Sequence, residues 1–118
     1  MVPSEKGNLK IRTLHLIELY NLKPRKNLGQ HFLICDYILH KEIEIADLAP
    51  TDVVLDIGAG LGFLTEELLT RVHKVYAVEV DDTLFEVLST RLKRYIVDRK
   101  LIPVKKDILK WQFPDDIT

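Results

Sequence analysis

The segment DIGAGLGFLT (residues 56–65) places three glycines, Gly58, Gly60 and Gly62, at alternate positions. Glycines at the junction of a strand and a helix adopt backbone angles closed to other residues and let a ligand approach the main-chain N–H groups. Glu79 follows about 20 residues later, where a carboxylate can accept hydrogen bonds from both hydroxyls of a ribose. This spacing predicts a site for a ligand that carries an adenosine ribose.

Two ligand classes carry that ribose: nicotinamide dinucleotides and S-adenosylmethionine. The dinucleotide fingerprint is G-x-G-x-x-G, whereas the glycines here give G-x-G-x-G. Acidic side chains also flank the glycines, at Asp56, Glu66 and Glu67, where they would repel a pyrophosphate at the helix N-terminus. A cationic sulfonium suits these surroundings better. We therefore predict S-adenosylmethionine as the cofactor and keep a dinucleotide-binding oxidoreductase module as an alternative.

A further carboxylate, Asp107, follows the third apolar run of this part of the chain and could accept a hydrogen bond from an adenine amino group. A helix cap or a solvated loop explains Asp107 on its own equally well. Three successive strands, however, would each deliver an acid to one edge of the sheet, and this arrangement indicates a site.

The strands that carry these acids are predicted at residues 53–57, 74–80 and 101–104, which are short runs rich in β-branched residues. The first of them, VVLDI, is typical of a strand buried on both faces. Helical spacing separates the runs, and right-handed crossovers then give a parallel sheet of order 3-2-1. The predicted fold is α/β, with a Rossmann-like parallel sheet and N-terminal helices.

Four helices are predicted from the spacing of apolar residues. Residues 8–21 form the first helix, and residues 36–48 form the second, with Asp36 as its N-cap. The third follows the glycines. The fourth opens at a capping box over Thr83–Glu86, and its apolar stripe continues to Tyr95.

Composition indicates one ordinary globular domain of 118 residues, with 47% hydrophobic and 30% charged residues. We divide it into an N-terminal helical extension, residues 1–23, and a partial cofactor-binding domain, residues 24–118. No apolar run approaches the roughly 18 residues of a membrane span, and a signal peptide's apolar stretch is absent from the first 30 residues. We expect a cytoplasmic protein. Cys35 is the only cysteine, so no metal site is predicted.

Positive charge is concentrated in two segments although the net charge is −1. Residues 1–30 and residues 91–100 each carry a net charge of +4. A basic surface of this kind could follow the phosphates of a nucleic acid, whereas solvated helix faces explain the charge equally well.

Four ordered motifs together resemble the rRNA adenine dimethyltransferases: NLGQHFL (27–33), VVLDIGAGLGFLTEELL (53–69), VYAVEVD (75–81) and VKKDILKWQFP (104–114). The GQH of the first motif is similar to the archaeal and eukaryotic branch of the small-subunit enzymes. The resemblance implies that the chain forms the N-terminal half of a Rossmann-like methyltransferase fold. It also implies methyl transfer from S-adenosylmethionine to the exocyclic amine of adenosines in small-subunit rRNA, with rRNA or the small ribosomal subunit as the partner.

The resemblance also implies a set of cofactor-binding residues: His31, Leu33, Gly58, Gly60, Glu79 and Asp107. The first two would close over the methionine end of the cofactor. Glu79 would hold the ribose diol and Asp107 the adenine amine. Trp111 and Phe113 could lie in the core or form a landing surface for a base, and we predict the core.

The family's N-[IL]-P-[YF] motif, which grips the target amine at the end of a fourth strand, does not occur in this sequence, so no catalytic residue is assigned. Without a fourth strand, the outer edge of residues 53–57 would face solvent. We expect a fragment of a larger enzyme, or self-association in which another chain covers that edge. A non-catalytic RNA-binding or interaction fragment is the remaining alternative.

Overall fold

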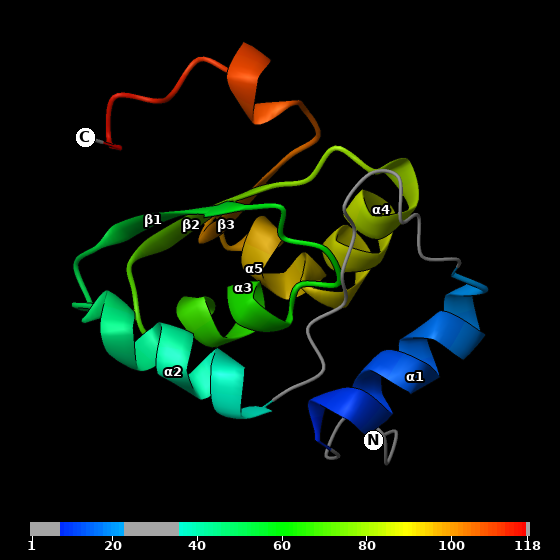
Figure 1. Ribbon diagram of the computed structural model, residues 1–118. Helices are drawn as coiled ribbons and strands as arrows, with labels where there is room; N and C mark the ends of the chain where they lie inside the picture. Colours follow the sequence, from blue (N-terminus) through cyan, green and yellow to red (C-terminus); the bar gives the residue numbers. More distant parts are fainter. Residues whose placement is uncertain (1–7, 23–35, 118) are drawn as a thin grey trace. The chain divides into compact units, whose positions relative to one another are not determined.

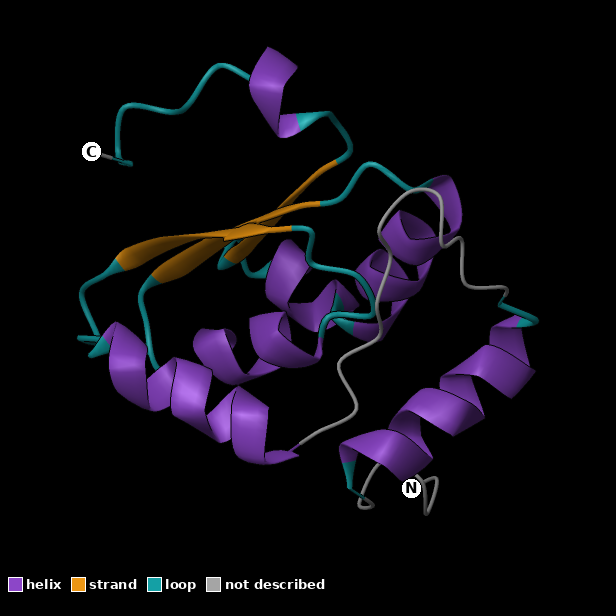
Figure 2. Ribbon diagram, viewed as in Figure 1, coloured by secondary structure: helices purple, strands orange, loops and turns teal. Residues whose placement is uncertain are grey.

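The computed structural model describes residues 8–22 and 36–117 (Figure 1). The chain forms two compact units, which meet in the sequence between Ile45 and Ala46. Figure 2 shows that the strands all belong to the second unit, whereas helices occur in both. The division predicted after residue 23 stays a prediction. Among the described residues, no helix has the length and apolar character needed to cross a membrane.

The first unit contains α1 (Leu9–Tyr20) and α2 (Asp36–Ala46). Asn8 caps α1 by accepting from Ile11 N, and Asn21 ends it in the left-handed conformation. Asp36 was predicted as the N-cap of α2, but it is the first helical residue. Its carboxylate instead accepts the first amide of α1, from Leu9 N at 3.3 Å. The prediction was wrong because a contact from a distant segment claims this side chain.

The second unit is built on three parallel strands, β1 (Val53–Ile57), β2 (Lys74–Val78) and β3 (Leu101–Val104). β2 lies in the middle and pairs with both neighbours, so the predicted order 3-2-1 is confirmed. Parallel pairing brings the carboxyl ends of all three strands to one edge of the sheet, which is where ligands bind in such folds.

One face of this sheet is covered by α3 (Phe63–Leu69), α4 (Asp82–Arg91) and α5 (Lys93–Val97), as Figure 1 shows. The strand residues on this face are deeply buried, including Val75, Ala77 and Leu101. A single helix was predicted over residues 83–95, but the structure has two helices there, α4 and α5, which are separated at Leu92.

The predicted capping box is also wrong, because the N-cap of α4 is Asp81. Its Oδ1 accepts from Leu84 N at 2.9 Å. The N-cap thus lies two residues before Thr83, the cap of the predicted box.

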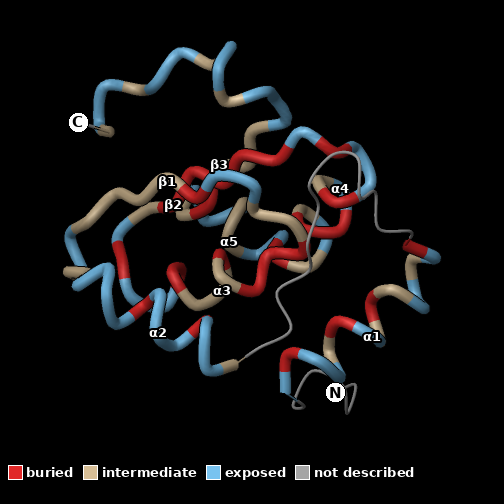
Figure 3. Tube along the Cα trace, viewed as in Figure 1, coloured by how far each residue is buried: buried red, intermediate tan, exposed pale blue. Residues whose placement is uncertain are grey.

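The opposite face of the sheet carries the C-terminal segment, which includes the 3-10 turn η3 (Ile108–Lys110). Trp111 contacts the Tyr76 ring at 5.8 Å between centroids, and Phe113 contacts Trp111 at 5.4 Å. Trp111 is half-buried, but Phe113 is 49% exposed, so its predicted core position is wrong. Figure 3 shows how little of this segment is buried.

The strand β1 was predicted to be buried on both faces, yet only Asp56 is buried and Ile57 is 56% exposed. Within the described residues, no strand pairs with its outer edge. The exposure of β1 follows because the C-terminal segment covers the second face of the sheet only in part and because no described strand pairs with the outer edge of β1. Pairing of this edge with another chain stays a prediction.

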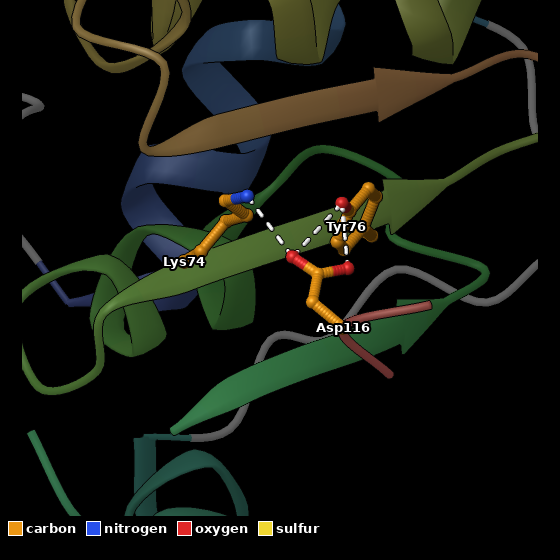
Figure 4. A network of polar contacts seen from close by, with 3 residues as sticks. All are labelled: Lys74, Tyr76 and Asp116. Carbon is orange, nitrogen blue, oxygen red and sulfur yellow. Dashed lines mark hydrogen bonds and ion pairs between the residues drawn. The ribbon is translucent and has the colours of Figure 1, made fainter. Parts of the chain in front are cut away.

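Asp116 fastens the C-terminal segment to β2 (Figure 4). The Lys74 ammonium donates to its Oδ2 at 3.0 Å, and the Tyr76 hydroxyl donates to Oδ1 at 2.9 Å. The hydrogen bond from Lys74, followed by the one from Tyr76, lowers the pKa of Asp116. The same bond raises the pKa of Lys74, whereas burial is the first cause of the raised pKa of Tyr76.

Gly62 is the last residue of the glycine turn, residues 58–62, and the N-cap of α3, and it lies against Leu88 of α4. Its φ is +89°, and a Cβ atom there would lie 2.5 Å from Leu88 Cδ1 and 3.3 Å from Leu92 Cδ1. Gly58 also has a positive φ of +70°, but a Cβ at that position would meet no atom within 4 Å.

We predict that Gly62→Ala lowers the free energy of unfolding more than Gly58→Ala does. Both substitutions force alanine into a left-handed conformation, at about 1–2 kcal/mol. Only the first also overpacks the contact with α4, which adds roughly 1–3 kcal/mol. Urea unfolding of the two variants measures the difference, and equal losses would contradict the packing argument.

A second prediction concerns pH. Because the folded-state pKa of Asp116 is lowered, its contribution to stability is complete above its ordinary value of 3.8 and is lost as pH falls through the folded-state value. The difference in unfolding free energy between the wild type and Asp116→Asn should therefore be constant near neutral pH and shrink toward zero in acid. Urea titrations at a series of pH values measure it. The neighbouring variant Asp115→Asn is the control, and a difference for Asp116→Asn that does not change with pH would contradict the prediction.

Candidate functional site

The glycine turn, residues 58–62, connects the end of β1 to α3. The amides of Gly58 and Ala59 donate to Val78 O at 2.8 and 3.1 Å, and Gly62 N donates to Ala59 O at 3.0 Å. These amides are thus engaged within the protein rather than held out for a ligand. What the turn offers is an exposed main chain at Gly58, where the missing side chain leaves open space.

Glu79 follows β2 directly and its carboxylate contacts the glycine turn, whereas its role as a ribose acceptor stays a prediction. Its Oε1 accepts from Gly60 N at 2.7 Å, and its Oε2 accepts from Asp81 N at 3.0 Å. The side chain is buried, with 6% of its surface exposed. Glu79 N also donates to Val104 O at 3.0 Å, so this one residue connects the ends of all three strands. A carboxylate has about four acceptor positions, which leaves about two beyond these bonds.

Asp107 follows β3 at the same edge of the sheet, but its carboxylate serves its own loop. Oδ1 accepts from Leu109 N at 2.9 Å and caps η3, and the residue is exposed. The cap that the sequence left open as an alternative is therefore present. No contact in the described residues joins this carboxylate to Glu79.

The acids around the turn are matched by local partners. Glu66 accepts from Arg91 Nη2 at 2.9 Å, and Glu67 lies 3.6 Å from Arg71 Nη2. The buried Asp56 accepts from Thr65 Oγ1 at 2.5 Å. Arginines thus compensate the charges of Glu66 and Glu67, whereas Asp56 accepts from an uncharged hydroxyl, so the choice of a cationic ligand over a pyrophosphate does not rest on these acids.

Arg91, the last residue of α4, was not predicted as part of the site but contacts the glycine turn. Its Nη1 donates to Leu61 O at 2.5 Å, and its guanidinium lies 4.7 Å from the centre of the Phe63 ring. The side chain is only 8% exposed. A buried arginine that contacts the turn, α3 and α4 fixes their relative position, and no local sequence pattern indicates such a contact.

Asp81 is the second residue that the prediction of the site overlooked. It is buried, caps α4 and donates its amide to Glu79. Its position two residues after Glu79 was a signal available in the sequence. His31 and Leu33, the predicted residues around the methionine end, lie outside the described residues. Within the described part of the chain, no group of three or more His, Cys, Asp or Glu residues could hold a metal ion.

Comparison with known proteins places this chain in a family. A family model described as ribosomal RNA adenine dimethylase matches residues 21–118. The ribosomal RNA small subunit methyltransferase A of Dehalococcoides mccartyi is 47% identical over 110 residues, which cover 93% of this chain and 36% of that protein. The protein of the same name from Lactobacillus acidophilus is 41% identical over 111 residues, which cover 91% of this chain and 38% of that protein. This chain thus spans little more than a third of the length of these relatives.

Solved structures agree on the fold. The 23S rRNA methyltransferase ErmE matches with a TM-score of 0.64 at 30% identity, covering 72% of this chain and 34% of that one. A dimethyladenosine transferase from Plasmodium falciparum matches with a TM-score of 0.63 at 32% identity, covering 73% of this chain and 31% of that one. Bacterial and eukaryotic proteins both match, so the predicted archaeal and eukaryotic branch stays a prediction.

The sheet order, the glycine turn with its buried glutamate, and a family match that extends over most of the sequence all agree. The chain belongs to the ribosomal RNA adenine dimethylase family.

Proposed function

We propose that this chain is the cofactor-binding part of an enzyme that transfers methyl groups from S-adenosylmethionine to the exocyclic amines of adenosines in small-subunit rRNA. The observation that carries the proposal is the buried Glu79 carboxylate bound to the glycine turn, in a chain whose relatives are named as ribosomal RNA small subunit methyltransferases. We also propose that it acts in the cytoplasm with rRNA or the small ribosomal subunit as its partner.

The residues of the turn fit an adenosyl group. Glu79 keeps about two acceptor positions, the number that a ribose diol requires. The open space beside Gly58 leaves room for a ligand to approach the backbone. Asp107 could turn from its cap on η3 toward an adenine amine, because its carboxylate is exposed and accepts one local hydrogen bond. His31 and Leu33 complete the proposed set.

The chain's own contribution to the chemistry is binding and orientation. When bound, S-adenosylmethionine supplies an already activated methyl group, so the protein mainly needs to align donor and acceptor. Glu79 is suited to this task because two backbone amides hold both of its oxygens. The rigid carboxylate fixes where a ribose would lie relative to the strand ends. The group that grips the target amine is not assigned to any residue of this chain.

We predict that Glu79→Gln weakens the binding of S-adenosylmethionine about 10-fold to 100-fold, which corresponds to about 1.4–2.8 kcal/mol. The amide loses the charge that strengthens hydrogen bonds from ribose hydroxyls, and it sets an NH₂ donor against the amide of Gly60 or Asp81. Isothermal titration calorimetry with purified chain measures the affinity.

The matched control is Asp82→Asn, which removes an exposed acid three residues away that pairs with Lys105. It should leave the affinity unchanged. Titration with a nicotinamide dinucleotide tests the alternative ligand class. Unchanged affinity in Glu79→Gln would remove this residue from the site, and preferential binding of the dinucleotide would defeat the proposed function.

A further inference from the structure

Four basic residues lie close together in the sequence, Lys93 and Arg94 at the start of α5 and Arg99 and Lys100 between α5 and β3; they are here called the cationic turn. Backbone hydrogen bonds fold the chain back on itself, with Arg99 N donating to Ile96 O at 3.0 Å and Lys100 N to Tyr95 O at 2.9 Å. These bonds bring Arg99 and Lys100 back beside α5, the helix that carries Lys93 and Arg94.

These charges are not paired with acids among the described residues. In the described part of the chain, no carboxylate lies within ion-pair distance of any residue of the cationic turn, and Asp98 is the only acid in residues 91–100. Arg94 instead stacks on the Tyr95 ring at 4.7 Å. By contrast, Lys74, Arg91 and Lys105 of the same unit each pair with an acid. Clustered cations without acidic partners are the footprint of a phosphate-binding surface.

A groove of about 760 Å³ adjoins the cationic turn, because Lys93 belongs to both and Ile96 of α5 also lines the groove. The half-buried ring of Phe85 lies in its lining. The acids of the lining, Asp82 and Glu86, equal its lysines in number, and Asp82 is paired with Lys105 at 3.1 Å. A neutral groove with an aromatic wall does not attract phosphates, but it suits the flat, uncharged face of a base.

We propose that the cationic turn and this groove bind a single-stranded segment of RNA, with phosphates on the turn and a base against Phe85. This inference rests on the proposed function, since it names the surface that would hold the rRNA substrate outside the cofactor site. An acidic protein segment would use the cations but would gain nothing from an uncharged aromatic groove, so RNA is the favoured partner.

The test measures the affinity of the chain for a fluorescent single-stranded RNA of about 12 nucleotides, a typical site size, as a function of salt. In the test variant, Lys93, Arg94, Arg99 and Lys100 are all replaced by glutamine. If all four contact phosphates, the slope of log K against log salt becomes shallower by about 2.8, which is 0.7 for each phosphate of a single strand. A change of at least about 1.4, half of this value, supports the proposal.

The matched control removes the same charge from four exposed residues on separate elements: Lys10, Lys41, Arg71 and Lys110, each replaced by glutamine. Its slope should change by less than about 0.7, the value for one phosphate. A third variant, Phe85→Leu, should weaken RNA binding roughly tenfold without changing the slope, because stacking does not depend on salt in the way that charge does.

Equal slopes in the two fourfold variants would overturn the proposal, as would competition by polyglutamate at the same concentration as by RNA. Calorimetry with S-adenosylmethionine separates this inference from the proposed function. If the wild-type chain binds the cofactor, but the fourfold substitution in the cationic turn leaves the RNA affinity unchanged, only the proposed RNA-binding surface is refuted. A chain that binds RNA through the turn but does not bind the cofactor refutes the proposed function and supports the surface.

Discussion

The bond between the Glu79 carboxylate and the backbone of the glycine turn determines the shape of the candidate site. A buried carboxylate is stable only when hydrogen bonds replace its lost hydration. Gly60 N and Asp81 N supply these bonds from two different loops, so the loops after β1 and β2 cannot move apart without exposing an unsatisfied charge. The Glu79 amide adds the end of β3 to the same arrangement. The carboxyl ends of the three strands are therefore connected through one residue, Glu79, which is also the proposed ribose acceptor.

The three glycines of the turn serve three different physical needs. Gly58 has a positive φ beside open space, Gly60 brings its amide to Glu79, and Gly62 allows α4 to pack against the turn. Arg91 then closes the turn from the helical side through Leu61 O. A spacing of alternate glycines was enough to indicate a turn at a strand–helix junction, but the sequence treats the three positions alike. Only the tertiary contacts distinguish them.

The sheet could be predicted because each strand is a short apolar run bounded by polar residues, and residues 101–104 match β3 at both ends. Features that depend on a particular side-chain partner could not. Asp81 and Thr83 are both acceptable caps for α4, and the hydrogen bond from Asp81 N to Glu79 favours the earlier one. Glu66 counted as a free acid in the sequence because its partner, Arg91, lies 25 residues away. Within the site, the spacing of Glu79 after the glycines placed it at the same strand edge as the turn, but its hydrogen bond with Gly60 N was not predicted.

The pairing of each strand with the next one in sequence has a consequence for how the second unit is made. Both crossovers of the sheet are short, so each parallel pair closes a loop of only about 20 to 30 residues, at a modest entropic expense. Since N-terminal segments leave the ribosome first, β1 and β2 with α3 between them can meet before β3 has been translated. The glycine turn would then take its shape early, and the contact of Glu79 with β3 would be added as the last strand docks.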